Sequence, residues 1–432
     1  MRPASRARLS FIALAWGVAT VLLRPVYAAE DASSATPQTL PVTLSECYQL
    51  ALKRSEEIAI RQELLKETEG RFTQALSAAL PRVSFDSSDK RQDGSGSSSF
   101  TLRYIPERKF TFSQPLFSGF KEFAAMAGSR AERRQRLQEE VRAEQLLFVD
   151  VSDAFYLLLE QQEDRSALDA SRLALVARLD ELRGRQRLGR SRSTEVVTAE
   201  AQLRRVEAEL AQNLSRQRVS QHLLEFLTGL DRVGPLSGAD PSFSILEPEE
   251  TYLAKSASRP DLRASEAAWH VAEQAVRVAK GDLFPKASVD GNYYVDRVGA
   301  AEDVKWDVAL MVHVPLFQGG QAVGAVKEAA SKARQAHLRY LEARRNVALD
   351  IRDAYTRVDS ALAVSAAFHN ALNASEESYR LETDDYRLNL VGNLEVLQTL
   401  QALQDARRDH IHARHDATRL FWRLRVAVGE TL

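Results

Sequence analysis

The residue types that most often carry catalysis or bind metals are sparse in this sequence and badly spaced for either task. Three histidines lie close together, His410, His412 and His415. Because a helix turns by about 100° per residue, His410 and His412 point roughly 200° apart, so the three do not share a helix face as metal ligands would. The pair Gly319-Gly320 lacks the strand, loop and helix of a phosphate-binding loop, and no Ser/His/Asp or Cys/His pattern is found. The sequence therefore predicts no enzyme, no metal site and no cofactor.

Composition indicates long, solvated helices rather than a nucleic-acid-binding surface. The 432 residues include 58 Lys and Arg and 59 Asp and Glu, giving a net charge of −1. A balance of this kind gives no reason to expect nucleic acid as a partner. Charged residues nonetheless make up 27% of the chain, with both signs mixed, which is typical of a solvated helical surface. The single cysteine, Cys47, excludes a disulfide framework and is expected to be a small buried residue.

The N-terminus has the features of an export signal. Three arginines precede the apolar run 9–23, and small residues follow at 26–28, so residues 1–28 are predicted to be a secretory signal peptide. An anchored transmembrane helix is the weaker alternative, because the run is short. Residues 29–42 form a polar leader. After cleavage no apolar stretch approaches the roughly 20 residues of a spanning helix, so a membrane location requires a barrel.

The sequence contains an internal duplication with an offset of 200 residues. Residues 114–119, Gln-Pro-Leu-Phe-Ser-Gly, return as Val-Pro-Leu-Phe-Gln-Gly at 314–319. Residues 150–155, Asp-Val-Ser-Asp-Ala-Phe, return as Asp-Ile-Arg-Asp-Ala-Tyr at 350–355. The unit is far longer than a solenoid repeat. It predicts two structural repeats, 43–230 and 249–432, joined by a linker at 231–248.

Each repeat has the same expected order of elements. In the first, a helix runs from 43 to about 79, opened by a capping box of Thr43 and Glu46. A β-hairpin at 82–117, a long helix at 118–187 and a helix at 194–228 follow it. The second repeat has a helix, a hairpin at 286–317, a long helix at 320–388 and a helix at 393–428. Each long helix, about 100 Å in length, is expected to pack antiparallel against two shorter ones.

One strand has a pattern suited to lipid. Residues 304–314 alternate strictly, with the apolar positions Val304, Trp306, Val308, Leu310 and Val312 on one expected lipid-facing side. The run has the length of a tilted barrel strand, which needs about 9–11 residues. Four strands are too few to close a membrane barrel, and open sheet edges cannot lie in lipid. The chain is therefore expected to oligomerise.

These features resemble the TolC-like outer-membrane efflux protein family. The resemblance rests on the two Pro-Leu-Phe-x-Gly junctions, the two Asp-Ala-(Phe/Tyr) motifs, and Tyr386 followed by 394–397, Leu-Glu-Val-Leu. It implies a mainly α fold with a membrane β-barrel part, in which four strands per protomer form a trimeric barrel of twelve strands continuous with periplasmic coiled-coil helices. It also implies a homotrimer in the outer membrane lipid of a Gram-negative bacterium, acting as the exit duct of a tripartite efflux or type I secretion system.

The resemblance also implies partners and sites. The expected partners are a periplasmic adaptor protein and an inner-membrane transporter of RND, ABC or MFS type. The expected junctions between barrel and helices are Pro115, Gly119, Pro315 and Gly319. The expected adaptor-docking turns comprise Gly189, Arg190, Arg192, Asn389 and Gly392. The expected periplasmic aperture comprises Glu395, Gln398, Tyr386, Glu195 and Thr198.

Several of these residues have a second interpretation. Glu395 either forms a ring of carboxylates in the trimer, which would favour cations, or is an acid favoured by the helix N-terminus. Tyr386 either holds a closed tip through hydrogen bonds between helices or is a surface tyrosine with a packed ring. The arginines of the first turn, which include Arg185 and Arg187, either contact an adaptor or form a solvated tip.

Two other functions remain as alternatives, a non-conducting periplasmic coiled-coil scaffold and an adaptor protein. A scaffold would not explain the lipid-length strand, and an adaptor has one helical hairpin rather than two equal halves. The cargo and the open or closed resting state are not indicated by the sequence.

Overall fold

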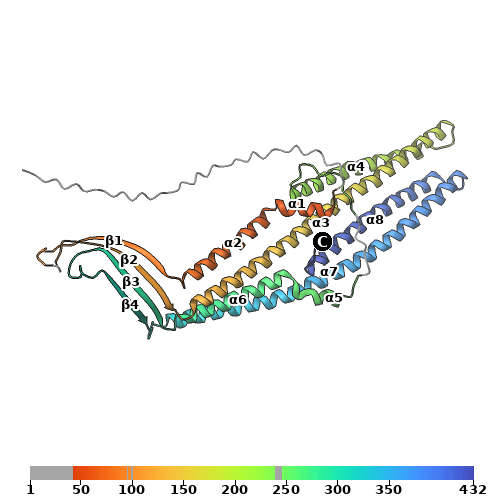
Figure 1. The fold of residues 1–432 in the computed structure, drawn as a ribbon. Coiled ribbons are helices and arrows are strands. Elements are labelled where there is room, and N and C mark those ends of the chain that lie inside the picture. The colour runs from red at the N-terminus through yellow and green to blue at the C-terminus, as the bar shows by residue number, and fades with distance from the viewer. Residues whose placement is uncertain (1–41, 95, 99–100, 239–245) are drawn as a thin grey trace, which may run out of the picture. The chain divides into compact units, whose positions relative to one another are not determined.

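The computed structural model describes residues 42–94, 96–98, 101–238 and 246–432 (Figure 1). The expected signal peptide and residues 29–41 of the leader lie outside the described residues. In the described part the chain is mainly helical with one small antiparallel sheet, so the expected fold class is confirmed in these features. No helix in these ranges combines the length and the apolar character needed to cross a lipid bilayer.

The two repeats have closely similar elements. The first contains α1 (Leu44–Arg54), α2 (Glu56–Ser77), β1 (Arg82–Arg91), β2 (Tyr104–Phe117), α3 (Lys121–Arg187) and α4 (Ser193–Thr228). The second contains α5 (Glu249–Ala254), η1 (Lys255–Ser258), α6 (Pro260–Gly281), β3 (Lys286–Arg297), β4 (Trp306–His313), α7 (Gln321–Arg387) and α8 (Asn393–Ala427). The long helices α3 and α7 each have 67 residues, or about 100 Å.

The expectation of one continuous helix from 43 to 79 is wrong. Ser55 has an extended backbone (ψ 115°) that ends α1. Its hydroxyl accepts a hydrogen bond of 3.4 Å from the N–H of Ile58 and so caps the start of α2. Serine favours such caps because its side chain replaces a missing backbone partner. The capping box at the start of α1 is confirmed, since Thr43 and Glu46 each accept a hydrogen bond from the other's N–H.

The four strands form one antiparallel sheet in the order β1-β2-β3-β4. Strand β4 is shorter than the alternating run 304–314. Val304 lies in the preceding turn, where its N–H donates to Ala301 at 3.1 Å, and the ladder with β3 reaches only to Lys305, whose carbonyl accepts from Tyr294 at 2.9 Å. The placement of Val304 in the strand is therefore corrected, because the turn uses its backbone N–H.

The two long helices are buried to very different degrees. Helix α3 packs against α2, α4, α6 and α8, whereas α7 packs mainly against α6 and α8. Twenty residues of α3 are buried but only five of α7, although the helices have equal length. The duplication predicts equivalent halves, yet among the described residues α3 is the central helix, and much of α7 has no packing partner there.

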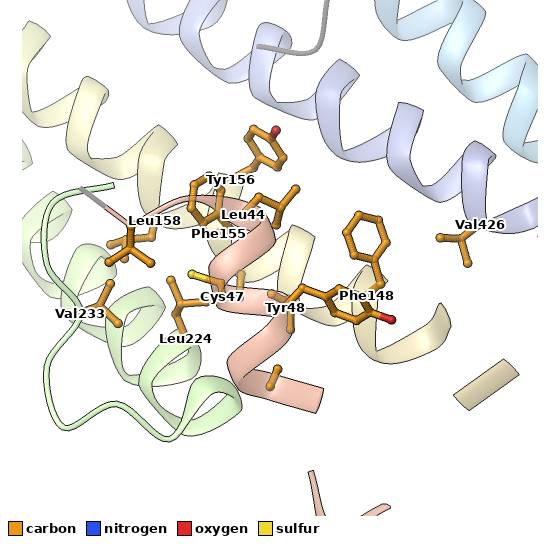
Figure 2. Close-up of a cluster of buried hydrophobic side chains, with 14 residues drawn as sticks. Leu44, Cys47, Tyr48, Phe148, Phe155, Tyr156, Leu158, Leu224, Val233 and Val426 are labelled. Atoms are coloured by element: carbon orange, nitrogen blue, oxygen red, sulfur yellow. The ribbon is translucent and has the colours of Figure 1, made fainter. Parts of the chain in front are cut away.

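The largest apolar core surrounds α1 (Figure 2). It joins side chains of α1, α3 and α4 with Val233 and Val426, and Phe148 and Phe155 of α3 are fully buried in it. The rings of Tyr48 and Phe148 meet edge to face, with centroids 5.1 Å apart. Cys47 is fully buried here, which confirms the expectation, and burial raises the pKa of its thiol to about 12.

The end of α6 and the junction between β2 and α3 approach each other through two glycines. Gly119 has φ +71°, and a Cβ built on it would lie 2.3 Å from the carbonyl oxygen of Gly281. Gly319, at the same place in the second repeat, has φ +60° but nothing within 4 Å of such a Cβ. The two junctions therefore share a backbone conformation but not a tight contact.

Replacing Gly119 with alanine is expected to be much more damaging than replacing Gly319. Both substitutions force alanine into the left-handed conformation, at a cost of about 1–2 kcal/mol. Only Gly119→Ala adds a backbone clash, for about 1–3 kcal/mol more. Thermal unfolding followed by circular dichroism would measure the difference, and equal losses for the two variants would contradict the close approach.

Candidate functional site

The turns after the two long helices have the same geometry. Gly189 (φ +72°) and Asn389 (φ +60°) both adopt the left-handed conformation, which glycine and asparagine tolerate best. In each turn two backbone N–H groups bond back to the end of the long helix. These bonds are Gly189 to Gln186 at 2.9 Å, Arg190 to Arg185 at 2.8 Å, Asn389 to Tyr386 at 3.0 Å, and Leu390 to Asp385 at 2.9 Å. The paired bonds form the Schellman pattern that ends a helix sharply.

The acidic residues that follow the turns are in different situations. The carboxylate of Glu195 accepts hydrogen bonds from the hydroxyl of Ser191 and from the N–H of Arg192, the latter at 3.3 Å. Glu195 therefore caps α4. Glu395 is exposed, and its Oε2 atom lies 3.0 Å from where a Cβ on Gly392 would be, so the carboxylate sits at the N-terminus of α8. The helix dipole favours an anion there, and the charge still faces solvent.

The second polar position of each turn is exposed as well. Gln398 lies one helical turn after Glu395 and faces solvent. Thr198 is also exposed, but its hydroxyl donates to the carbonyl of Thr194 at 2.9 Å. Its hydroxyl hydrogen is therefore already used in a hydrogen bond. Glu195 and Thr198 therefore have their side chains held by local hydrogen bonds, whereas the side chains of Glu395 and Gln398 face solvent.

Tyr386 joins the two repeats through its ring. The guanidinium groups of Arg178 and Arg185, both on α3, lie 3.7 and 4.4 Å from the ring centroid, and Tyr386 is buried. Arg178 also donates to the side-chain oxygen of Asn393 at 2.7 Å, at the start of α8. Cation–π contacts of this kind contribute about 0.5–2 kcal/mol. No sequence pattern indicates Arg178 or Asn393, because their hydrogen bond joins residues 215 positions apart.

The basic character of the first turn is only partly exposed. Arg187, Arg190 and Arg192 face solvent. Arg185 was expected to be exposed with them, but it is half-buried against Tyr386 and pairs with Glu181 at 2.8 Å. The exposed cationic surface of this turn is therefore smaller than the sequence indicated.

The three neighbouring histidines contact partners on other helices. The ring of His410 lies 5.2 Å from that of His369, while His412 contacts Glu160 and His415 contacts Glu163. Among the described residues, no group of three or more His, Cys, Asp or Glu side chains could hold a metal ion.

At the sheet, the two faces differ in chemistry. One face has a ladder of polar side chains across all four strands, in which the hydroxyl of Thr111 contacts Asp86 at 2.8 Å and Asn292 at 3.1 Å, and Asn292 donates to Asp307 at 2.9 Å. The other face has apolar side chains at the alternate positions. On β4 these are 62–66% exposed, namely Trp306, Val308, Leu310 and Val312.

Both outer strands of the sheet leave an edge without a partner among the residues that the structure describes. Since Lys305 bonds to Tyr294, and bonded pairs alternate along an antiparallel ladder, the backbone groups of residues 306, 308, 310 and 312 point away from β3. In the same way Gln92 bonds to Arg103, so residues 83, 85, 87, 89 and 91 point away from β2. Two open edges of unlike sequence are thus available for pairing.

The residues expected at the junctions lie near the ends of the strands. Pro115 is in β2, beside a shift in the register with β3 between Pro115 and Phe117. Pro315 lies beyond the end of β4, and the neighbouring side chains of Leu316 and Phe317 are almost fully exposed. The two junctions therefore share their sequence motif but differ in strand length.

Two repeats, each with one long helix packed against shorter ones and two strands of a shared sheet, define a class of proteins that combine a helical part with a four-stranded antiparallel sheet. The family model described as outer membrane efflux protein matches residues 47–230 and 254–430. The chain belongs to this family, which is one of outer membrane proteins and not of enzymes.

Individual relatives are similar over nearly the whole chain. The outer membrane protein TolC of Vibrio cholerae is 21% identical over 94% of this chain and 95% of the relative. The alkaline protease secretion protein AprF of Pseudomonas aeruginosa is 22% identical over 89% of this chain and 84% of the relative. Among solved structures, the outer membrane protein VceC of Vibrio cholerae matches with a TM-score of 0.76 and 19% identity, over 90% of this chain and 96% of VceC.

Proposed function

We propose that the chain is one subunit of a homotrimeric outer-membrane channel that passively conducts substrates from the periplasm to the exterior. The observation that carries this proposal is the sheet, because it has two open edges, one polar face and one apolar exposed face. In a membrane barrel, lipid-facing apolar residues alternate with lumen-facing polar residues, and every edge is paired. The four strands of one chain fit this arrangement only when copies close the ring.

The edges of the sheet are suited to pairing between copies. The order β1-β2-β3-β4 is antiparallel, so β4 of one copy and β1 of the next would also run antiparallel. Three copies would then form a barrel of twelve strands. This arrangement places the Val308 face toward lipid and the Thr111 ladder toward the lumen.

The exposed side of α7 supports association in the helical part too. Five large apolar side chains of α7 are exposed at intervals along its length, namely Val323, Leu338, Leu349, Val364 and Leu381. Apolar groups repeated along a helix that has few partners in its own chain are typical of an interface. Neighbouring copies would cover this side of α7 and enclose a periplasmic conduit.

The far turns are the proposed entrance of the conduit. In a trimer, three copies of Glu395 would surround the axis and favour cations. The exposed arginines of the first turn, Arg187, Arg190 and Arg192, would contact a periplasmic adaptor, which links the channel to an inner-membrane transporter that supplies energy. Because one relative is named for alkaline protease secretion, proteins are one candidate cargo, and small molecules are the other. A non-conducting scaffold is disfavoured because it would not need the apolar sheet face.

Removing the charge of Glu395 is expected to lower cation selectivity. A unit charge about 4 Å from an ion contributes about 1 kcal/mol even in water, so the ratio of cation to anion permeability should fall about fivefold in Glu395→Gln. The measurement is the reversal potential of the reconstituted protein in planar bilayers under a salt gradient.

Glu63→Gln is the matched control, because Glu63 is an exposed carboxylate on α2, remote in sequence from the turns. This variant should keep the original permeability ratio. An unchanged ratio in Glu395→Gln would reject the carboxylate ring, and the absence of any conductance from the intact protein would reject the channel itself.

A further inference from the structure

Helices α3 and α8 are joined by ion pairs in which α3 supplies the acidic partners and α8 supplies the basic ones. The α3–α8 seam consists of four acidic residues on α3 and six basic residues on α8. The acidic members are Asp153, Glu160, Glu163 and Asp164, and the basic members are Arg408, His412, Arg414, His415, Arg419 and Arg423. Helix α3 forms a helical hairpin with α4 in the first repeat, and α8 forms one with α7 in the second repeat. The seam therefore holds the two helical hairpins of one chain together.

The seam places two of its four carboxylates where water can hardly solvate them. The side chain of Asp164 is fully buried, and that of Glu160 is 7% exposed. Oε1 of Glu160 lies 2.6 Å from Nδ1 of His412, and its Oε2 lies 3.3 Å from a guanidinium nitrogen of Arg419 but makes no hydrogen bond. A buried carboxylate is costly unless a positive partner and hydrogen bonds compensate for its lost hydration.

His412 is a partner whose charge depends on pH near neutrality. Its hydrogen bond with Glu160 raises the pKa of His412 above the usual value, and the negative charges of Glu160 and Asp164 act in the same direction, against burial and the charge of Arg408. On α4, Glu209 reaches the same place and pairs with Arg408 at 2.7 Å. The remaining arginines of the seam keep their charge at all relevant pH values.

The sign of the effect follows from the raised pKa. Protonation of His412 stabilises the packed arrangement fully at pH values below the ordinary pKa of histidine. That stabilisation is lost as the pH rises through the raised pKa of His412, because the imidazole then becomes neutral beside a buried carboxylate. Low pH therefore favours the contact between α3 and α8, and higher pH weakens this contact.

We propose that the contact of His412 with Glu160 makes the α3–α8 seam a pH-sensitive latch, which holds the two helical hairpins together in acid and lets them separate as the pH rises. This inference rests on the proposed function, because the hairpins end in the turns proposed as the entrance. His412 lies 19 residues from the start of α8, or about 28 Å from the turn. A small rotation at the latch would therefore move the turn by a larger distance.

The separation of the turns can be measured without any assay of conduction. Spin labels on cysteines at Leu188 and Leu388, which are exposed residues of the two turns, report the distance between the hairpins of one chain. Labelled chains are diluted with unlabelled chains so that each trimer carries at most one pair. Cys47 is fully buried, so the label attaches at the introduced sites.

In the labelled protein that keeps His412, the population with the longer distance between the two labels should grow as the pH rises from 5.5 to 8.5. Each unit by which the packed form raises the pKa of His412 corresponds to about a tenfold change in the ratio of the two populations. His412→Gln, which keeps a polar group but not the charge, should show the longer distance at every pH. His412→Lys, which stays charged, should keep the shorter distance up to pH 8.5.

His222→Gln is the control, because His222 is exposed on α4 and should leave the pH response unchanged. A distance that does not respond to pH in the folded protein, or a full response in His412→Gln, would overturn the latch. If the distance responds but planar bilayers show no conductance, the latch stands and the proposed channel fails. If the protein conducts but the distance does not respond, the channel stands and the latch fails.

Discussion

Replacing Leu310 with proline is expected to abolish the proposed trimer while leaving the fold of each chain intact. The N–H of residue 310 points away from β3, toward the open edge of the sheet, since bonded positions on β4 alternate from Lys305. Proline removes this donor, and its ring obstructs an incoming strand. A lost hydrogen bond with an unsatisfied acceptor costs about 1–3 kcal/mol, and three copies multiply the loss, so trimer formation should fall by at least about a hundredfold.

Native mass spectrometry of the detergent-solubilised protein would measure this loss. Leu310→Ala is the matched control, because it truncates the same exposed side chain but keeps the N–H, and it should assemble normally. Ala309→Pro removes a backbone N–H that points toward β3, so this variant should damage the β-hairpin of β3 and β4 itself. A stable Leu310→Pro trimer would show that β4 is not the edge through which copies pair.

Replacing Arg408 with methionine is expected to cause a large loss of stability in the helical part. Arg408 contacts Asp164 at 2.6 Å and Glu209 at 2.7 Å, and Asp164 is fully buried. Without the arginine, Asp164 keeps only a hydrogen bond of 3.0 Å from Asn213. Removing one partner of a buried ion pair typically costs about 3–5 kcal/mol, because the other charge is left without compensation.

The adjacent residue supplies the control for this measurement. Arg407 forms an ion pair of 2.7 Å with Glu376, but both side chains are well exposed, so Arg407→Met should cost less than about 1 kcal/mol. Denaturant unfolding followed by circular dichroism at a fixed chain concentration compares the two variants. Adding Asp164→Asn to Arg408→Met should restore part of the stability, because it removes the uncompensated charge. Equal losses for the two methionine variants would refute the burial argument.

The sequence predicts the order of elements well because the signals are local or repeated. The duplication, the proline-free helices and the alternating strand each depend on residues close together in the chain. The sequence does not indicate the break at Ser55, because a single serine within a periodic helical pattern is compatible with a continuous helix. Boundaries such as the start of β4 depend on which backbone groups a turn consumes, as at Val304.

The contacts that the sequence does not indicate depend on pairing across the fold. Arg178 and Tyr386 lie on helices of different repeats. His412 contacts Glu160, which is 252 positions away in the sequence. Spacing along one helix predicts that the three histidines do not share a face, but it does not show which residue each histidine contacts. The same limit applies to the burial of α3, because a duplicated sequence does not reveal which copy becomes central.

The unlike edges of the sheet have a genetic consequence. A ring in which β4 of each copy pairs with β1 of the next uses one head-to-tail interface three times, so a single defective edge leaves the whole ring open. A chain with a damaged β4 but an intact β1 could still join normal chains and spoil the assemblies that it enters. Such an allele should therefore be dominant over the normal gene in the same cell, whereas an allele whose chain does not fold should be recessive.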